Sequence, residues 1–338
     1  MTTPALQTLQ HKLCPWLRPA LNQLETAYAA GRLGHAWLIA GPAGAGKLNL
    51  ALVFARRVLE RRRSANGELP DLSPAEAVQA LRDKHVPADH HPDLHWLFPD
   101  EDKTAVSVEQ VREAAAALSL KAHGGVAKVV LIEQADGMTI AAANALLKTL
   151  EEPSDATYLL LLADQPNRLP ATIRSRCQRL IVPKPTQSEL ARWLGVRPEE
   201  FAAAWVLTGG SPLRIASLIL DDKINETSKL SEQLQLISSD GISVQSVAGS
   251  WSKADTELAL TWLTRELHRA VRERLGSTSV TDREPIALHN AWRDLTLRRL
   301  FDQYEKADRL LGQLGSGINV ELGLQAVLLG FQANRGTT

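Results

Sequence analysis

The sequence has little of what marks several large classes of protein. Its 338 residues include two cysteines, Cys14 and Cys177, which are too few and too far apart for a disulfide framework or a four-cysteine zinc site. Lys plus Arg and Asp plus Glu each number 38, so the formal net charge is zero and does not indicate a dedicated nucleic-acid binder. There is no run of about 18 apolar residues, and the first residues carry no signal-peptide pattern. These absences predict a cytoplasmic protein with free thiols and no membrane partner.

The most specific motif that is present is a phosphate-binding loop. Residues Gly41 to Lys47 read Gly-Pro-Ala-Gly-Ala-Gly-Lys, between a short apolar run and a helical pattern. In such loops the backbone N–H groups cradle phosphates, the lysine reaches the β- and γ-phosphates, and a following Ser or Thr holds Mg²⁺. The candidate nucleotide ligands are therefore Gly41, Gly44, Gly46 and Lys47. A glycine-rich turn without a ligand is the structural alternative.

Two places near this loop lack groups that ATP hydrolysis needs. Leu48 follows the lysine where a Ser or Thr hydroxyl would hold Mg²⁺, and leucine has no oxygen to offer. Glu133 and Gln134 follow an apolar run, at the place where P-loop enzymes carry metal-binding and water-polarising acids. Glutamine cannot accept a proton from water at neutral pH, whereas Glu133 either reaches a metal or is a solvated acid at a strand end. The loop is therefore predicted to keep the architecture of a nucleotide-binding loop and to lack groups that hydrolysis needs.

Alternating apolar runs and helical patterns predict the fold class. Four apolar runs with strand character occupy residues 35–40, 93–98, 128–133 and 157–163. Helical patterns separate them, and such alternation is typical of a parallel sheet covered by helices on both faces. Ser107 and Gln110 have the spacing of a capping box at the start of one of these helices, which is expected to run to about residue 121.

The remainder of the sequence has helical rather than strand patterns. Short amphipathic segments at 188–194 and 201–208 predict a small helical region, and stripes at 258–275 and 295–311 predict an all-α C-terminal part. Three tryptophans add apolar surface to that part: Trp251, Trp262 and Trp292. They either fill its core or belong to an interface with other subunits.

Two later motifs, taken with the loop, resemble bacterial clamp-loader subunits of the AAA+ superfamily. Residues 144–153 read Asn-Ala-Leu-Leu-Lys-Thr-Leu-Glu-Glu-Pro, and residues 169–177 read Leu-Pro-Ala-Thr-Ile-Arg-Ser-Arg-Cys. The resemblance is closer to the delta prime family than to the gamma/tau ATPases. It implies a P-loop NTPase-like α/β (AAA+) domain with a parallel sheet, followed by a small helical lid and an all-α C-terminal collar domain. The implied boundaries are 1–185, 186–220 and 221–338.

The resemblance also assigns roles to single residues. Arg176, in the sequence Ser-Arg-Cys, is implied to be an arginine finger that acts in trans on the ATP site of a neighbouring subunit. There a guanidinium would stabilise charge on the transferred phosphate. A surface arginine in a local salt bridge is the structural alternative. Ala163 and Asp164 stand where active relatives usually carry a Thr or Asn that senses the γ-phosphate, and neither an alanine nor an acid can donate to a phosphate.

No metal site is expected. Relatives of this kind often carry a four-cysteine zinc module after the loop helix, but residues 61–82 contain no cysteine, so zinc is not expected there. Four histidines lie close together in the sequence: His85, His90, His91 and His95. Their irregular spacing does not fit metal ligation.

The resemblance implies the function of a non-hydrolysing stator in the clamp loader of DNA polymerase III, a DNA-directed DNA polymerase and thus a nucleotidyltransferase assembly. The implied partners are the gamma/tau and delta subunits of a hetero-pentamer, the sliding clamp and, through the complex, primed DNA. The sequence leaves open whether ATP or ADP binds without being hydrolysed. One alternative is an active clamp-loader ATPase of the gamma/tau type, against which Leu48, Glu133 and Gln134 argue. The other is a stand-alone DNA-binding protein, against which the charge balance argues.

Overall fold

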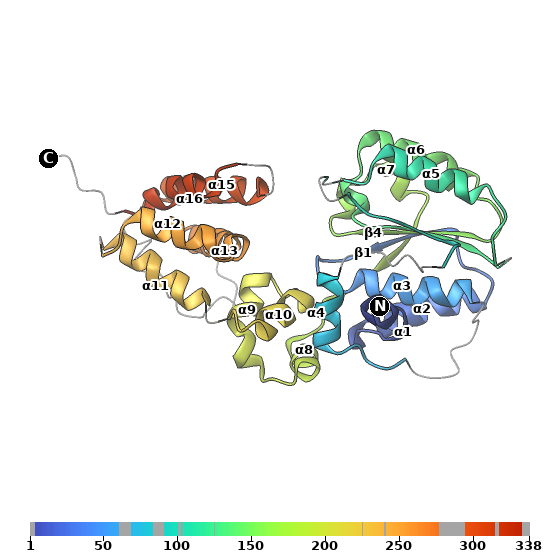
Figure 1. Cartoon of the computed structure of the whole chain (residues 1–338), viewed down its shortest axis with the longest axis horizontal. Coiled ribbons are helices and arrows are strands. Elements are labelled where there is room, and N and C mark those ends of the chain that lie inside the picture. Colours follow the sequence, from blue (N-terminus) through green and yellow to red (C-terminus); the bar gives the residue numbers. More distant parts are fainter. Residues whose placement is uncertain are drawn as a thin grey trace. The chain divides into compact units, whose positions relative to one another are not determined.

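The chain divides into two compact units, Met1–Leu220 and Asp221–Thr338, which Figure 1 colours along the sequence. The computed structural model describes residues 4–60, 69–83, 91–100, 103, 105–124, 126–224, 226–239, 241–276, 295–314 and 318–332. Some residues named above lie outside the described part of the chain: residues 61–68 of the cysteine-free stretch, His85, His90 and Trp292.

The first unit is built on one parallel sheet. Its strands are β1 (Ala36–Ala40), β2 (Leu94–Leu97), β3 (Lys128–Ile132), β4 (Thr157–Ala163) and β5 (Gln178–Ile181). Their order is β2-β3-β4-β1-β5, and every neighbouring pair is parallel. This sheet confirms the predicted α/β fold class and the four predicted strands. The fifth strand is missing from the prediction, because Leu180 is the only residue of β5 that is buried.

Helices cover both faces of the sheet, as Figure 1 shows. On one face lie α1 (Pro4–His11), α2 (Arg18–Ala29) and α3 (Lys47–Leu59), and on the other lie α5 (Val108–Leu118), α6 (Ile140–Glu151) and α7 (Ala171–Arg174). Alternate residues of a strand point to opposite faces. Trp37 and Ile39 of β1 accordingly pack in one core cluster, and Leu38 packs in the other. Both faces are apolar, which is why the central strands read as continuous apolar runs.

The predicted capping box is present at the start of α5. Ser107 Oγ accepts a hydrogen bond from Gln110 N at 3.2 Å, and Gln110 Oε1 accepts one from Ser107 N at 2.9 Å. These bonds satisfy backbone N–H groups that have no partner within the helix. The helix ends at Leu118, somewhat before the predicted end.

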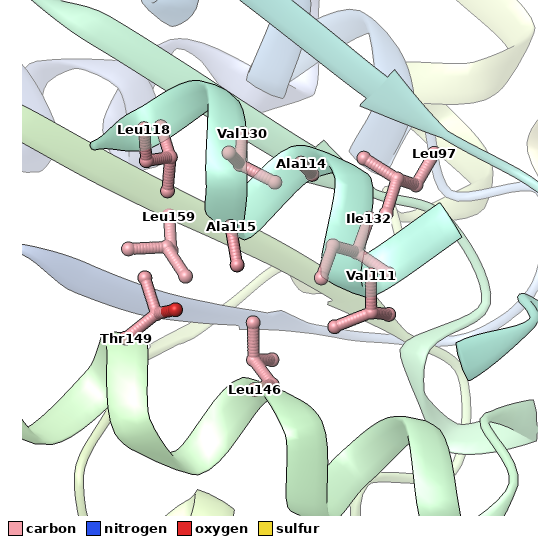
Figure 2. A pocket seen from close by; sticks show the side chains of 10 residues that line it. All are labelled: Leu97, Val111, Ala114, Ala115, Leu118, Val130, Ile132, Leu146, Thr149 and Leu159. Atoms are coloured by element: carbon pink, nitrogen blue, oxygen red, sulfur yellow. The ribbon is translucent and has the colours of Figure 1, made fainter. Parts of the chain in front are cut away.

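A small apolar cavity lies between α5, α6 and the sheet (Figure 2). Leu97 and Leu159 line it from the sheet, Val111 from α5 and Leu146 from α6. It encloses about 10 Å³, and its walls are aliphatic apart from the Thr149 side chain. That is about the space of one water molecule, far below the size of a ligand site. The cavity is therefore a packing defect.

The helices between residues 186 and 220 pack within the same unit as the sheet. They are α8 (Gln187–Leu194), α9 (Ala202–Thr208) and α10 (Pro212–Leu220). Trp193 of α8 donates from Nε1 to Leu72 O at 2.6 Å, just before α4 (Pro74–Arg82). Its ring also meets Trp16 edge to face, with centroids 4.9 Å apart. Helices are thus found where a lid is predicted, and the separation of that lid as a domain of its own stays a prediction.

No single helix in the described ranges is both long and apolar enough to cross a membrane. One pair, Pro198–Thr208 and Pro212–Leu220, has the required length and composition only when the two are joined, and they are bent by 119°. Phe201, Leu207 and Ile215 of this pair are buried. Burial of this kind is what core helices show.

The second unit is helical throughout its described part. Its α-helices are α11 (Glu226–Ser238), α12 (Val244–Lys253), α13 (Thr256–Arg274), α15 (Leu297–Gly312) and α16 (Val320–Leu328). Trp251 and Trp262 are 1% and 6% exposed, and their rings meet edge to face with centroids 6.2 Å apart. Both tryptophans therefore fill the core of this unit and do not mark a surface for another subunit. The role of the unit as a collar stays a prediction.

A buried carboxylate fixes the loop that leads from α5 to β3. Asp93 is 2% exposed, and it accepts hydrogen bonds from His123 N at 2.7 Å and Gly124 N at 2.8 Å. Burial raises the pKa of the Asp93 carboxyl, but the two backbone hydrogen bonds outweigh burial and hold that pKa below its ordinary value. Asp93 therefore stabilises the fold in its charged form.

Replacing Asp93 by asparagine is expected to lower the free energy of unfolding near pH 7 by about 1.5–3 kcal/mol, the range for hydrogen bonds to a charged group. Because the pKa is lowered in the folded chain, this contribution is complete above the unfolded value of about 3.9. It is lost as the pH falls through the folded value. Urea unfolding of both proteins near pH 7 and near pH 3 measures the effect. A difference between the two proteins that is equally large at both pH values would contradict the assignment.

Candidate functional site

The candidate site is centred on the loop between β1 and α3. The helix follows the loop directly, so strand, glycine-rich loop and helix occur in the order that the motif requires. Gly44 and Gly46 have φ angles of +69° and +92°, which residues with a side chain rarely adopt. A Cβ atom on Gly41 would lie 2.6 Å from the carbonyl oxygen of Val182, just after β5. The backbone of the chain itself therefore requires these three glycines, with or without a ligand.

Lys47 is turned back onto its own loop. Its side chain is 7% exposed, and Nζ donates to Gly41 O at 2.8 Å, to Pro42 O at 2.8 Å and to Asp164 Oδ1 at 2.5 Å. Asp164 directly follows β4, and the register between β1 and β4 brings the ends of these two strands level. The lysine that was predicted to reach a phosphate thus forms an ion pair inside the chain.

The start of α10 also lies on the loop. Leu213 N donates to Gly44 O at 3.3 Å. Ser211, just before the helix, is so close that a Cβ atom on Gly44 would lie 2.1 Å from its Oγ. The residue after β4 and the start of α10 therefore both contact the loop. Sequence reasoning missed these two contacts, because no local pattern around the loop signals segments so distant in the chain.

At the positions where P-loop enzymes carry catalytic groups, this chain has residues that make structural contacts. Leu48 packs against the apolar core of the first unit. Glu133 Oε1 accepts a hydrogen bond from Trp96 Nε1 of β2 at 2.7 Å, which favours the interpretation of Glu133 as a strand-end acid over metal ligation. Gln134 has left-handed backbone angles, with φ 49° and ψ 43°, and opens a 3-10 turn.

Metal and thiol chemistry have little support in the part of the chain that the structure describes. No group of three or more His, Cys, Asp or Glu side chains there could hold a metal ion. His91, one of the clustered histidines, accepts at Nδ1 from Asp93 N at 3.1 Å. Burial raises the pKa of the Cys14 thiol far above its ordinary value and that of Cys177 to about 11. Both thiols are therefore protonated near neutral pH, and neither is a reactive thiolate.

Arg176 lies on an exposed turn between α7 and β5. Its Nη2 atom is 2.7 Å from Glu151 Oε1 at the end of α6, and Nη1 donates to Thr172 O at 3.0 Å. The side chains of Arg176 and Glu151 are 36% and 51% exposed, so the ion pair is open to water. Arg176 thus contacts α6 and α7, whereas Lys47 contacts its own loop and Asp164. The structure therefore describes two separate candidate features rather than one joint site.

Comparison with known proteins gives matches over most of the chain. Residues 16–186 match the family model described as DNA polymerase III, delta subunit. A DNA polymerase III subunit delta′ from Pseudomonas aeruginosa is 36% identical over 253 residues, covering 73% of this chain and 74% of that protein. The protein of the same name from Escherichia coli K12 is 32% identical over 272 residues, which is 79% of each chain. A DNA polymerase III subunit tau from Bacillus subtilis is 26% identical over 156 residues, covering 46% of this chain and 26% of that one.

Among solved structures, a DNA polymerase III gamma subunit-related protein from Thermotoga maritima aligns with a TM-score of 0.44 and 16% identity. The alignment covers 92% of this chain and 98% of that chain. The sequence matches identify the family, because the family model spans half of the chain and two delta′ relatives above 30% identity share most of its length. The chain belongs to the family of DNA polymerase III delta prime subunits.

Proposed function

We propose that this chain is a clamp-loader subunit of DNA polymerase III that does not hydrolyse ATP itself. The observation that carries the proposal is Leu48: a Ser or Thr hydroxyl holds Mg²⁺ at this position in P-loop enzymes, and here an apolar side chain packs against the core. Gln134 adds a second loss, because an amide cannot take a proton from the attacking water. Membership of the delta prime family supports a role within the polymerase assembly.

Arg176 is proposed to act as an arginine finger on the ATP site of a neighbouring gamma/tau subunit. Its exposed place on the turn before β5 suits contact with another chain, and its ion pair with Glu151 is open to water. Exposed ion pairs contribute only about 0–1 kcal/mol. Exchange of the Glu151 carboxylate for a phosphate of higher charge therefore costs little, and the planar guanidinium matches phosphate oxygens.

The proposed partners are the gamma/tau and delta subunits of a hetero-pentameric loader, the sliding clamp, and primed DNA reached through the complex. A relative named subunit tau matches 46% of this chain. This match supports the proposal that the neighbouring gamma/tau subunits have a first domain similar to the one in this chain. Residues 1–185 would form the AAA+ domain and residues 186–220 the lid. The second compact unit, Asp221–Thr338, would be the collar through which the subunits associate.

The isolated chain is expected to hydrolyse ATP no faster than its Lys47→Ala variant, because Leu48 and Gln134 stand where P-loop enzymes carry the metal-binding hydroxyl and the water-polarising acid. A phosphate-release assay on both proteins, with Mg²⁺ in excess, measures this. Circular dichroism of the variant checks that it is folded. Turnover by the unmodified chain that Lys47→Ala abolishes would instead establish an active ATPase of the gamma/tau type.

A further inference from the structure

The ammonium group of Lys47 has no donor left for a phosphate. An ammonium group has three N–H donors and no acceptor. The chain provides three oxygen atoms at hydrogen-bond distance, namely Gly41 O and Pro42 O at 2.8 Å and Asp164 Oδ1 at 2.5 Å. The Lys47 side chain is 7% exposed, whereas that of Asp164 is 44% exposed. The Lys47 ammonium group therefore lies inside the loop, and the carboxylate that balances its charge lies at the rim.

Asp164 supplies what a bound phosphate would supply, a negatively charged oxygen next to the lysine. A carboxylate at this point also disfavours a phosphate, because two like charges that share one partly desolvated site raise the energy of both. Removing every counter-ion from a buried lysine is strongly unfavourable as well. The internal pair therefore stabilises the empty loop and competes with any phosphate for the same three donors.

We propose that the Asp164 carboxylate is an internal counter-ion of Lys47 that prevents nucleoside di- and triphosphates from binding at the loop. The backbone and the lysine of the phosphate site are retained, so the site would bind phosphate once this charge is removed. The three glycines and Lys47 are in place, and the charged group that opposes a phosphate beside the lysine is the Asp164 carboxylate, whose side chain is 44% exposed at the rim. The inference deepens the proposed function by naming what keeps nucleotide out of this subunit. It rests on that function only for the lack of turnover.

The test is direct binding of ADP to the full chain, by calorimetry and by thermal shift, for the unmodified protein and Asp164→Asn. Asparagine keeps the shape and an acceptor for Lys47 but removes the charge. We expect ADP to bind Asp164→Asn at least about tenfold more tightly than the unmodified chain, and to raise the melting temperature of the variant more. Because Leu48 offers no metal ligand, we expect the same affinity with Mg²⁺ and with EDTA.

Three further variants act as controls. Asp155→Asn makes the same change of charge in the exposed turn before β4 and is expected to leave ADP binding unchanged. The double variant Lys47→Ala/Asp164→Asn is expected to lose the gained affinity. Asp164→Thr, a second neutral variant, is expected to gain affinity and covers the case in which Asp164→Asn is unstable. Equal ADP affinity of the unmodified chain and both neutral variants, or an equal gain in Asp155→Asn, overturns the proposal.

ATP hydrolysis measured on the same proteins separates the two hypotheses. No gain in affinity and no turnover in any protein overturns the counter-ion role of Asp164 and leaves the proposed function standing. A gain in affinity with turnover in Asp164→Asn supports the counter-ion role, and it overturns the view that Leu48 and Gln134 suffice to prevent hydrolysis. A gain in affinity without turnover supports both.

Discussion

Replacing Arg176 by alanine is expected to lower the DNA- and clamp-stimulated ATP hydrolysis of an assembled loader without weakening its assembly. A finger of the proposed kind supplies on the order of 10³–10⁵ in rate at its own site. A loader with several ATP sites would lose one of them, so the total rate falls partially. The fold is expected to be unaffected, because Arg176 is exposed and its partners Glu151, Thr172 O and Ser175 Oγ are contacted at the surface. The measurement is steady-state hydrolysis by the purified complex with clamp and primed DNA.

Neighbouring residues provide matched controls for this prediction. Arg174 and Arg179 are exposed on either side of the same turn, and replacing either by alanine removes the same charge. Glu151→Gln removes the charge that pairs with Arg176 within the chain. If Arg176 breaks this ion pair when the complex forms, Glu151→Gln should not change the stimulated rate of ATP hydrolysis. A loss in Arg174→Ala or Arg179→Ala as large as in Arg176→Ala would point to general charge on the turn. An unchanged rate of ATP hydrolysis in a complete complex that carries Arg176→Ala would show that Arg176 forms a surface ion pair and is not a finger.

Replacing Trp251 by alanine is expected to destabilise the second unit by about 3–5 kcal/mol, the range for removal of a large buried aromatic side chain. Trp251 is 1% exposed, packs edge to face on Trp262, and donates from Nε1 to Gln233 Oε1 at 2.8 Å. The substitution removes apolar burial, an aromatic contact and a hydrogen bond, and it leaves a cavity. Hydrogen exchange of the amides in α12 and α13 measures the loss within this unit.

Phe301 offers the comparison for this core substitution. It is an aromatic residue of α15 that is 42% exposed, so Phe301→Ala is expected to change the stability by no more than about 0.5 kcal/mol. Trp251→Phe keeps much of the burial and is expected to lie between the two. Exchange rates in α12 and α13 that are the same in Trp251→Ala as in the unmodified chain would show that this tryptophan does not hold the unit together.

Strands that are buried on both faces could be predicted from the sequence, because their apolar runs are continuous. β1 and β3 are buried at every position. β5 could not be predicted, since Gln178, Arg179 and Ile181 are exposed at the edge of the sheet and Leu180 alone reaches the core. So short a segment carries no periodicity that distinguishes it from a loop. Its place beside β1 is set by pairing between distant segments, which a local pattern does not contain.

The candidate site was predictable in its parts but not in its connections. The glycine spacing indicated the loop, and the sequence marked Ala163 and Asp164 as residues that cannot donate to a phosphate. The bond between Lys47 and Asp164 joins residues that are 117 positions apart. It depends on the β1–β4 register, which also lets Gly41 N donate to Ala163 O at 3.2 Å. Only the arrangement of the sheet brings the lysine and the carboxylate together.

The close approach of Gly41 to the Val182 carbonyl bears on how such chains are recognised in genomes. A side chain at position 41 would push the end of β5 away from β1, so the glycine is needed by the architecture even where no nucleotide is bound. A pattern of glycines and a lysine therefore indicates the turn and does not by itself identify an ATPase. The residue that follows β4 is the more informative position. A carboxylate there, together with a lysine at the end of the loop, would indicate a sequence in which the lysine pairs with a carboxylate of its own chain, as Lys47 does with Asp164.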